Sequence, residues 1–455
     1  MARGKKKESA LTPEEKLERA LVPESEWPYQ VPENWCWTTV GAVNQYDGGS
    51  VDPLKEPNKW FELYSVPSSA DNYPEIVQGA EIGSSKQEVN KGDVLLCKIN
   101  PRINRVWRVH QHTEHKLLGS SEWIVIRNPQ INSQYLMWCL RSRYFREYML
   151  SNVSGVGGSL MRAQPKYVQG YPFPLPPLAE QQRIVDRIES LFAKLDEAKE
   201  KAQTVLDSFE TRKAAILHKA FTGELTAKWR AEHGVGMEKW RSAPLQEICT
   251  KITDGTHHSP PNSDVGDYMY VTAKNIKEYG VDLTNITYVT KEVHDEIYAR
   301  CDVRAGDVLY IKDGATTGIA TVNTITEPFS LLSSVAVLRP LPGVVNPYYM
   351  AYHLNSSETK AMMINNMSGN AITRLTLAKI KNAQITVCSI DEQQEIVRIL
   401  DSLFAKEQQA KEAAEAVLEK IDLLKKSILA RAFRGELGTN DPSEESAVEL
   451  LKQIL

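Results

Sequence analysis

Cationic and amide side chains are concentrated in one short segment of the first half of the chain, 98–108. Its candidate DNA-contacting residues are Lys98, Asn100, Arg102, Asn104, Arg105 and Arg108, with one tryptophan and no acidic residue between them. Lysine and arginine suit phosphates and guanine edges, and asparagine suits adenine. The surrounding stretch 91–147 has ten basic and four acidic residues, a local charge of +6. A charged loop over an ordinary core is the alternative, but the interleaved amides favour contact with DNA.

Two turn-rich loops, 254–261 and 312–318, are the corresponding candidates in the second half of the chain. Both can present polar groups to a DNA groove or a phosphate, although short loops of this kind are often simple turns. The residues expected to contact DNA in this half are Thr256, His257, Lys274, Asn275, Lys312, Thr316 and Thr317.

One arginine is matched between the halves. Arg162 and Arg374 are 212 residues apart, and each follows a polar stretch that contains glycine. A shared phosphate contact and a structural ion pair both fit this pattern, and we include both arginines among the candidates.

Catalytic and metal-binding motifs are missing from the sequence. It has no Walker loop, no Gly-x-Ser-x-Gly motif and no convincing set of nuclease carboxylates. The six cysteines form no CxxC pair. The histidine groups 110–115 and 257–258 lack cysteine or carboxylate partners at helical ligand spacing, which favours surface histidines over a metal site. We therefore expect no catalytic residue, metal or cofactor in this chain.

The segment Asn346-Pro-Tyr-Tyr349 is a near match to the Asn-Pro-Pro-Tyr motif of adenine methyltransferases, but its second proline is missing. Asn132 occupies the same place in the first half of the chain. We therefore expect both asparagines to cap helices.

An internal repeat organises the chain. Residues 180–225 and 392–437 align without a gap at an offset of 212, with 24 identities in 46 positions. Apolar residues recur at the three- and four-residue steps of a coiled coil, and Arg212 and Glu407 interrupt the two seams. The expected seam residues are Ile184, Ile188, Leu191, Leu195, Val205, Phe209, Ile396, Leu400, Leu403, Val417, Ile421 and Ile428. Separate packing of each helix on its own domain is the alternative, but the near-identical seams favour an antiparallel pair.

The blocks between the helices contain most of the glycine, proline and aromatic residues, together with short β-rich runs. We expect each block to form an α/β (α+β) domain, present in two copies. The expected boundaries are an N-terminal arm (1–30), a first domain (31–177), a long helix (178–225), a linker (226–243), a second domain (244–389), a second long helix (390–437) and a C-terminal tail helix (438–455). Thr12 should cap a helix in the arm, and Asp441 should open the tail helix.

Composition limits the possible partners. The net charge of −4 excludes indiscriminate coating of nucleic acid, so any DNA-binding surface must be local. No apolar run approaches the roughly 20 residues that span a bilayer, and no apolar stretch of a signal peptide follows the basic N-terminus. We expect no membrane association and a cytoplasmic location.

Two α/β domains, each followed by a near-identical long helix, resemble the specificity (S) subunits of type I restriction-modification systems. The motifs that support this resemblance are Pro174–Gln182, Ile390–Gln394, the Phe-x-Gly-Glu-Leu helix ends and the Gly-Asp-Val-Leu strands. Asp254–His257 is also similar to the opening loop of many recognition domains in that family. The resemblance covers nearly the whole chain.

The resemblance implies that each domain is a target recognition domain for one half of a bipartite DNA site. It implies that the helices form an antiparallel coiled coil, which sets the spacer and docks two methyltransferase (M) subunits. Two restriction/translocase (R) subunits would join them. S-adenosylmethionine, ATP and magnesium would be bound by these partners. The alternatives are a stand-alone adenine methyltransferase or nuclease, and a coiled-coil scaffold without DNA contact.

Overall fold

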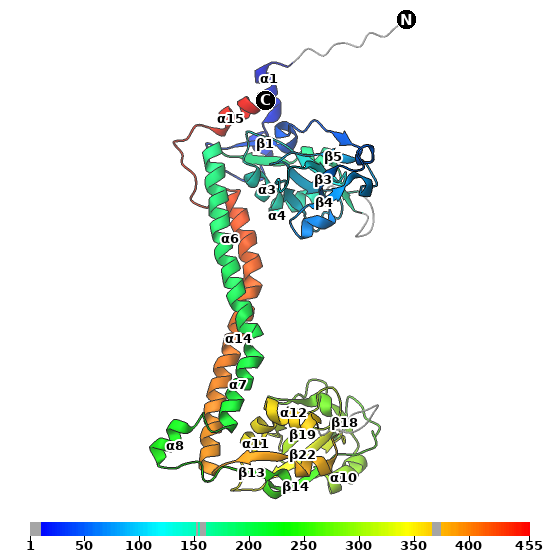
Figure 1. Cartoon of the computed structure of the whole chain (residues 1–455), viewed down its shortest axis with the longest axis vertical. Coiled ribbons are helices and arrows are strands. Elements are labelled where there is room, and N and C mark those ends of the chain that lie inside the picture. Colours follow the sequence, from blue (N-terminus) through cyan, green and yellow to red (C-terminus); the bar gives the residue numbers. More distant parts are fainter. Residues whose placement is uncertain (1–10, 152, 155–160, 366–374) are drawn as a thin grey trace. The chain divides into compact units, whose positions relative to one another are not determined.

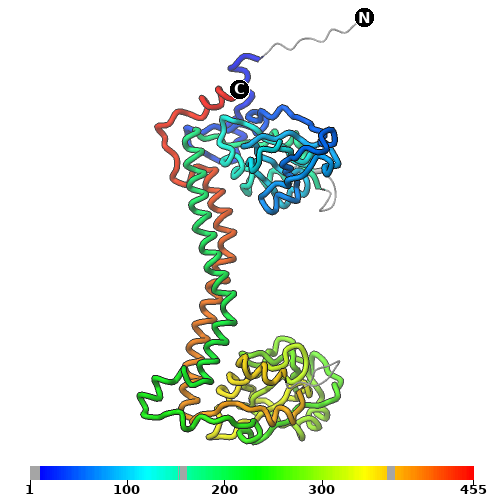
Figure 2. Tube along the Cα trace, in the orientation of Figure 1, coloured from blue at the N-terminus to red at the C-terminus, as the bar shows by residue number. Residues whose placement is uncertain are grey.

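The computed structural model describes residues 11–151, 153–154, 161–365 and 375–455. The chain separates into two units, Met1–Ala202 with Ala416–Leu455, and Gln203–Glu415. Each unit contains one α/β domain and two helical segments, one from each copy of the repeat. Figure 1 labels these elements and Figure 2 follows the chain through them.

The domain of the first unit is built on antiparallel sheets with one parallel pair, β3 with β8. A five-stranded sheet has the order β2-β5-β8-β3-β4, and a three-stranded sheet has the order β7-β6-β9. The strands are β1 (Cys36–Thr39), β2 (Ser50–Val51), β3 (Trp60–Tyr64), β4 (Glu75–Gln78), β5 (Lys86–Glu88), β6 (Val94–Cys97), β7 (Val106–Arg108), β8 (Lys116–Gly119), β9 (Trp123–Ile126), β10 (Val153–Ser154), β11 (Arg162–Ala163) and β12 (Pro172–Leu175). The helices are α1 (Pro13–Ala20), α2 (Val40–Val43), α3 (Ser133–Arg141), α4 (Arg143–Ser151) and α5 (Pro165–Gln169).

The second domain also has two main sheets, but their numbers of strands differ from those of the first domain. Its larger sheet has the order β14-β22-β19-β20, and a second sheet has the order β18-β15-β21. The strands are β13 (Arg241–Pro244), β14 (Cys249–Asp254), β15 (Tyr268–Val271), β16 (Ile276–Lys277), β17 (Gly280–Val281), β18 (Thr287–Val289), β19 (Val308–Ile311), β20 (Ala320–Val322), β21 (Ser330–Leu331), β22 (Val335–Pro340) and β23 (Gln384–Val387). The helices are α8 (Ala227–His233), α9 (Leu245–Ile248), α10 (Lys291–Arg300), α11 (Pro347–Leu354), α12 (Ser357–Asn365) and α13 (Leu377–Asn382).

The repeated Gly-Asp-Val-Leu motif forms the same ion pair in both domains. Nε and Nη2 of Arg127 each lie 2.8 Å from a carboxylate oxygen of Asp93, which is buried. The equivalent distances from Arg339 to the buried Asp307 are both 2.9 Å. These hydrogen bonds raise the pKa of both arginines. A bidentate pair of this geometry fixes two strands side by side, so the motif has a structural role.

The duplicated Glu-Gln-Gln motif joins each long helix to its domain. Gln181 accepts a hydrogen bond from the backbone N–H of Asn132 at 2.9 Å, and Gln393 accepts one from that of Asn346 at 2.8 Å. The preceding glutamates accept from indole N–H groups, Glu180 from Trp35 at 2.7 Å and Glu392 from Trp240 at 2.9 Å. All four motif side chains are buried. The motif is therefore a structural anchor.

The first long helix is divided where a single helix over 178–225 was expected. The structure has α6 (Leu178–Asp207) and α7 (Phe209–Phe221), whereas α14 (Ile390–Ala432) is continuous. At the division, Nη1 of Arg212 donates to the Val205 carbonyl at 3.2 Å. A side chain that takes a helix carbonyl disturbs the backbone ladder at that point. The same guanidinium pairs with Glu407 of α14, Nη2 to Oε2 at 2.7 Å. The two residues that interrupt the predicted seams are thus partners.

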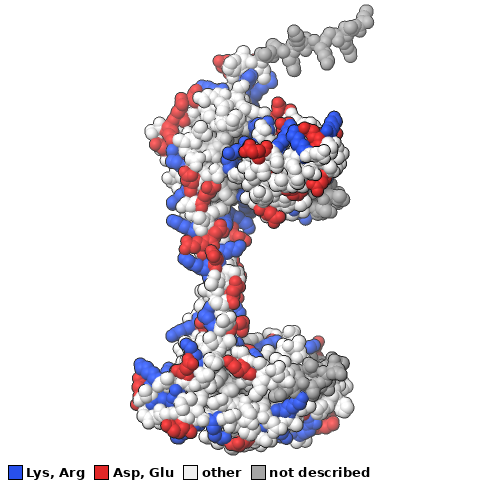
Figure 3. Space-filling model, in the orientation of Figure 1, with Lys and Arg blue, Asp and Glu red and all other residues white. Residues whose placement is uncertain are grey.

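Within each unit the two helical segments run antiparallel. In the first unit Nζ of Lys425 lies 2.5 Å from Oδ1 of Asp196, and in the second Lys411 lies over the ring of Phe209 at 5.2 Å. Cations and anions are interspersed along the helices in Figure 3. Of the twelve expected seam residues, five are buried (Ile184, Ile188, Ile396, Leu400 and Ile421) and six are half-buried. Val417, at 40% exposure, is outside the seam.

We predict that the ion pair between Arg212 and Glu407 determines the register of the two helices more than it contributes to their stability. Changing either residue alone to leucine should lower the free energy of unfolding, because the charge of the other residue then lacks its partner. The double change to leucine should restore or exceed the original stability. Urea unfolding of the two single variants and the double variant checks this. Additive losses would contradict it.

The C-terminal helix starts later than the expected capping box at Asp441. The helix is α15 (Ala447–Ile454) with Ser446 as its cap. Asp441 instead closes a turn with Ser443, and Glu444 pairs with Arg183 at 2.8 Å. In the arm, α1 is capped by Thr12 as predicted, and Nζ of Lys16 on this helix donates to the Leu455 carbonyl at 2.9 Å. The arm and the tail thus contact each other in the first unit.

Candidate nucleic-acid interface

Two of the candidate segments, 98–108 and 312–318, contain the same loop of the two domains. The first joins β6 to β7 and the second joins β19 to β20, at an offset of 214. Both loops begin at a lysine whose carbonyl accepts a backbone hydrogen bond from a later segment. The Lys98 carbonyl accepts from the N–H of Ala163, and the Lys312 carbonyl accepts from that of Leu375. The sequence analysis treated these loops separately.

The two asparagines of the loop in the first domain are half-buried. Asn100 and Asn104 have positive φ angles of 47° and 51°, a conformation that asparagine tolerates well. Nδ2 of Asn104 donates to the Leu140 carbonyl at 3.1 Å, and the Oδ1 atoms of both asparagines are buried. The amide oxygens of both expected adenine contacts are therefore unavailable to DNA, and both residues shape the loop.

The cations of this loop differ in exposure. Arg102 is exposed, whereas Lys98, Arg105 and Arg108 are half-buried, and Nε of Arg108 donates to Oγ of Ser133 at 2.7 Å. Arg162, on the neighbouring strand β11, is 53% exposed and pairs with Glu122 at 2.8 Å. The structure thus favours an ion pair for Arg162. Arg374 lies outside the described residues.

In the second domain the two candidate loops meet at the buried carboxylate of Asp254. Nζ of Lys312 lies 3.5 Å from Oδ2 of Asp254 and 3.1 Å from Oδ2 of Asp313, and only 8% of the lysine side chain is exposed. His257, 56% exposed, lies 3.6 Å from Oδ1 of Asp254. Lys312 was expected to reach DNA, but it is enclosed by acidic partners.

Gly255 explains why a glycine follows Asp254 in this loop. The Thr256 N–H donates to the Leu331 carbonyl at 2.9 Å, and a Cβ on Gly255 would lie 1.9 Å from the same oxygen. Only glycine permits this approach. Thr256 is half-buried, its hydroxyl donating to the His258 carbonyl at 3.0 Å.

A polar cleft of about 610 Å³ adjoins this loop. It is lined by Ser259, Asn262, Lys274, Lys277 and Asn285, among others. Lys274 is exposed at its rim, whereas Asn275 is 6% exposed and its Nδ2 donates to the Asp282 carbonyl at 3.1 Å. Of this predicted pair, Lys274 can reach a ligand and Asn275 holds a turn.

The two candidate threonines of the loop 312–318 differ in exposure. Thr316 is exposed, whereas Oγ1 of Thr317, which is half-buried, donates to the Gly314 carbonyl at 2.7 Å.

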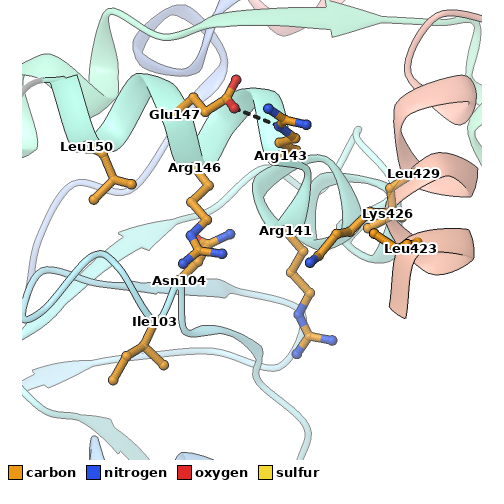
Figure 4. Close-up of a pocket in the computed structure, with 10 residues that line it drawn as sticks. All are labelled: Ile103, Asn104, Arg141, Arg143, Arg146, Glu147, Leu150, Leu423, Lys426 and Leu429. Atoms are coloured by element: carbon orange, nitrogen blue, oxygen red, sulfur yellow. Dashed lines mark hydrogen bonds and ion pairs between the residues drawn. The ribbon is translucent and has the colours of Figure 1, made fainter. Parts of the chain in front are cut away.

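Three arginines at the junction of α3 and α4 were not among the residues predicted from the sequence. Arg141, Arg143 and Arg146 line a cleft of about 570 Å³ with Asn104 of the loop and with Lys426 of α14, all within the first unit (Figure 4). We call this the junction cleft. The only signal for it was the local charge of +6 over 91–147. Lys426 could not be assigned to it, because it is hundreds of residues away in the chain.

The near match to a methyltransferase motif is a helix cap. Oδ1 of Asn346 accepts from the backbone N–H groups of Tyr348 and Tyr349, and Asn132 caps α3 in the same way. Across the part of the chain that the structure describes, no group of three histidine, cysteine or acidic side chains is placed to hold a metal. Nor is any helix of that part long and apolar enough to cross a membrane.

Comparison with known proteins agrees with the fold and the motifs. Residues 237–420 match the family model described as the type I restriction modification DNA specificity domain. The EcoKI specificity subunit of Escherichia coli K12 is 25% identical over 460 residues, covering 93% of this chain and 96% of that subunit. The EcoBI specificity subunit of Escherichia coli is 28% identical over 303 residues, 62% of this chain and 63% of its own length.

A solved structure shares the fold. The HsdS subunit of Thermoanaerobacter tengcongensis has a TM-score of 0.67 at 22% identity, over 90% of this chain and all of that one. A chain from a structure of complex assembly and conformational transition in a type I R-M system has a TM-score of 0.65 at 23% identity. Residues 237–420 thus match a type I restriction-modification DNA specificity domain, and nearly the whole chain is similar to specificity subunits of such systems.

Proposed function

We propose that this chain is the DNA-recognition subunit of a type I restriction-modification complex and has no catalytic role of its own. The observation that supports this best is the duplication of one α/β domain with the same anchored helix and the same β-hairpin loop. Two similar domains on one chain suit a target with two half-sites, as dimers suit repeated half-sites in other DNA-binding proteins. The exposed candidates Arg102, Lys274 and Thr316 are the side chains best placed for contact.

We propose that the paired helices fix the spacer between the half-sites and dock two M subunits, which R subunits join. S-adenosylmethionine would be bound by the M subunits, and ATP and magnesium by the R subunits. Such a complex acts on host DNA in the cytoplasm. The net charge of −4 on this chain supports dependence on partners for much of the electrostatic attraction to DNA.

Methylation mapping tests the proposal directly. The chain is combined with its M subunit, a labelled methyl donor and genomic DNA, and we expect adenine methylation confined to two short sequences at a fixed separation. Protection of two patches on a bound duplex should give the same half-sites. Methylation by the purified chain alone would contradict a non-catalytic role, and a single protected patch would contradict the bipartite target.

Two lysines of the second domain provide a matched comparison. Lys274→Gln should weaken DNA binding several-fold without changing thermal stability, because Lys274 is exposed at the cleft. Lys312→Gln should cost about 1–3 kcal/mol of stability, because it leaves Asp313 and Asp254 short of a buried cation. DNA titration and thermal unfolding of both variants check this. Equal effects of the two substitutions on binding and on stability would argue against it.

A further inference from the structure

The junction cleft contains more positive charge than its own acidic residue can balance. Arg143 pairs with Glu147 at 2.7 Å, and Arg141 donates to the Val106 carbonyl at 2.7 Å. Arg146 and Lys426 are exposed and form no ion pair with the described residues. In Figure 4, Arg141, Arg146 and Lys426 extend into the space between the helices, whereas Glu147 turns to Arg143.

The equivalent cleft of the second unit already contains an anion. It is lined by Leu217, the repeat partner of Leu429 in the junction cleft. Lys360 occupies the position of Arg146 at an offset of 214. Nζ of Lys360 lies 2.9 Å from Oε1 of Glu278, and Lys213 contacts the other oxygen of the same carboxylate.

Glu278 comes from the segment between β16 and β17. Burial acts to raise its pKa, but the ion pairs with Lys213 and Lys360 outweigh burial and lower the pKa below the ordinary value of glutamate. The side chain is therefore ionised. In the second unit, the lysine at the position of Arg146 is thus paired with a carboxylate from outside the helices, whereas Arg146 has no such partner among the described residues.

We propose that the junction cleft binds a phosphate of the DNA backbone, and so grips the duplex beside the first recognition domain without reading its sequence. This inference rests on the proposed function. Arginine and lysine side chains around a shallow cleft suit a phosphate, which accepts several charge-assisted hydrogen bonds at once. Ile103 and Asn104 of the candidate loop line the same cleft, so DNA in contact with Arg102 can reach it. The two recognition domains then differ at this position, because Glu278 already pairs with the equivalent lysine of the second domain.

The test uses the complete complex with M subunits and the double variant Arg146→Gln, Lys426→Gln. Affinity is measured from 50 to 200 mM salt for a bipartite duplex and for a scrambled duplex. We expect the slope of log affinity against log salt to flatten by about one to two. For each phosphate contact that is lost, the fall in affinity between 50 and 200 mM salt should become about 3.5-fold smaller. The loss at low salt should be the same factor for both duplexes.

Three controls sharpen this test. Lys360→Gln should leave the slope unchanged, because Glu278 already pairs with that lysine. Arg146→Lys should keep most of the slope. Replacing phosphates one at a time by uncharged methylphosphonate should reveal one position that weakens the original complex and not the double variant.

An unchanged slope in a folded double variant would overturn the proposal. Loss of M subunits with an unchanged DNA slope would also overturn it, and would indicate an acidic protein segment as the occupant. A complex that does not distinguish the bipartite from the scrambled duplex would refute the proposed function instead. The difference in salt slope between the original complex and the double variant, measured on either duplex, would still decide whether the cleft binds a phosphate.

Discussion

A complex whose long helices each carry one additional heptad will select a target with a spacer about three base pairs longer, and it will recognise the same two half-sites. Seven residues add about 10 Å to a helix, and one base pair rises about 3.4 Å. A heptad preserves the phase of the seam, so the helices can still pair. We would insert it after Ala202 in α6 and after Glu415 in α14, where both helices pass from one unit to the other. The contacts inside each unit are then kept.

Binding to the original target should fall towards the non-specific level, a loss of roughly 10³-fold or more. Selection from a pool of duplexes with varied spacers measures both the preferred spacer and the half-sites. The control inserts the same seven residues after Gly234, in the exposed segment that follows α8, and should leave the spacer unchanged. Altered half-sites, or an unchanged spacer in the helix variant, would refute the proposal that the helices act as a ruler.

The second large effect concerns stability. Glu392→Gln should destabilise the second unit by about 3–5 kcal/mol, because it removes one partner of a buried ion pair. Glu392 is 2% exposed and accepts from Arg230 at 2.6 Å, from Thr226 at 2.7 Å and from Trp240 at 2.9 Å. Only 11% of the Arg230 side chain is exposed. Without the carboxylate, this guanidinium retains two neutral acceptors, the Gly223 carbonyl at 2.7 Å and the Thr226 hydroxyl at 3.0 Å.

Urea unfolding of matched variants separates this effect from a general sensitivity of the helix. Glu395→Gln, three residues away, removes an ion pair with the exposed Arg398 and should cost less than about 1 kcal/mol. Glu180→Gln should cost an intermediate amount, about 1–3 kcal/mol, because Trp35, Thr439 and Asn440, which donate to that carboxylate, are neutral. Equal losses for Glu392→Gln and Glu395→Gln would show that burial of the pair contributes nothing.

Features that depend on local sequence were predicted well. Asn132, Asn346 and Thr12 cap helices where expected, because a cap is decided by a side chain and the three residues after it. The helical segments follow from their heptad pattern, since side chains three and four residues apart share one face. The expected start of the tail helix was wrong, because Asp441 could cap either a turn or a helix. Contact between Glu444 and Arg183, 261 residues apart, accompanies the turn.

Exposure of the candidate residues was the least predictable property. Lys312, Asn275 and Asn104 have the residue types of DNA contacts, yet each is taken by a partner inside its domain. The accessible candidates Arg102 and Lys274 look no different in sequence. Whether a polar side chain reaches solvent depends on neighbours from distant segments, which one sequence does not identify.

The sequence by itself determined that this chain is one unit used twice, with two α/β domains and two paired helices. A repeat of 24 identities in 46 positions and a heptad seam are properties of residue order. Only the tertiary structure decided that Arg212 and Glu407, 195 residues apart, interrupt the seam together. It also assembled the junction cleft from the first domain and α14. The physical reason is that helix pairing brings together charges far apart in the chain, and their balance then decides whether a surface remains open to an anion.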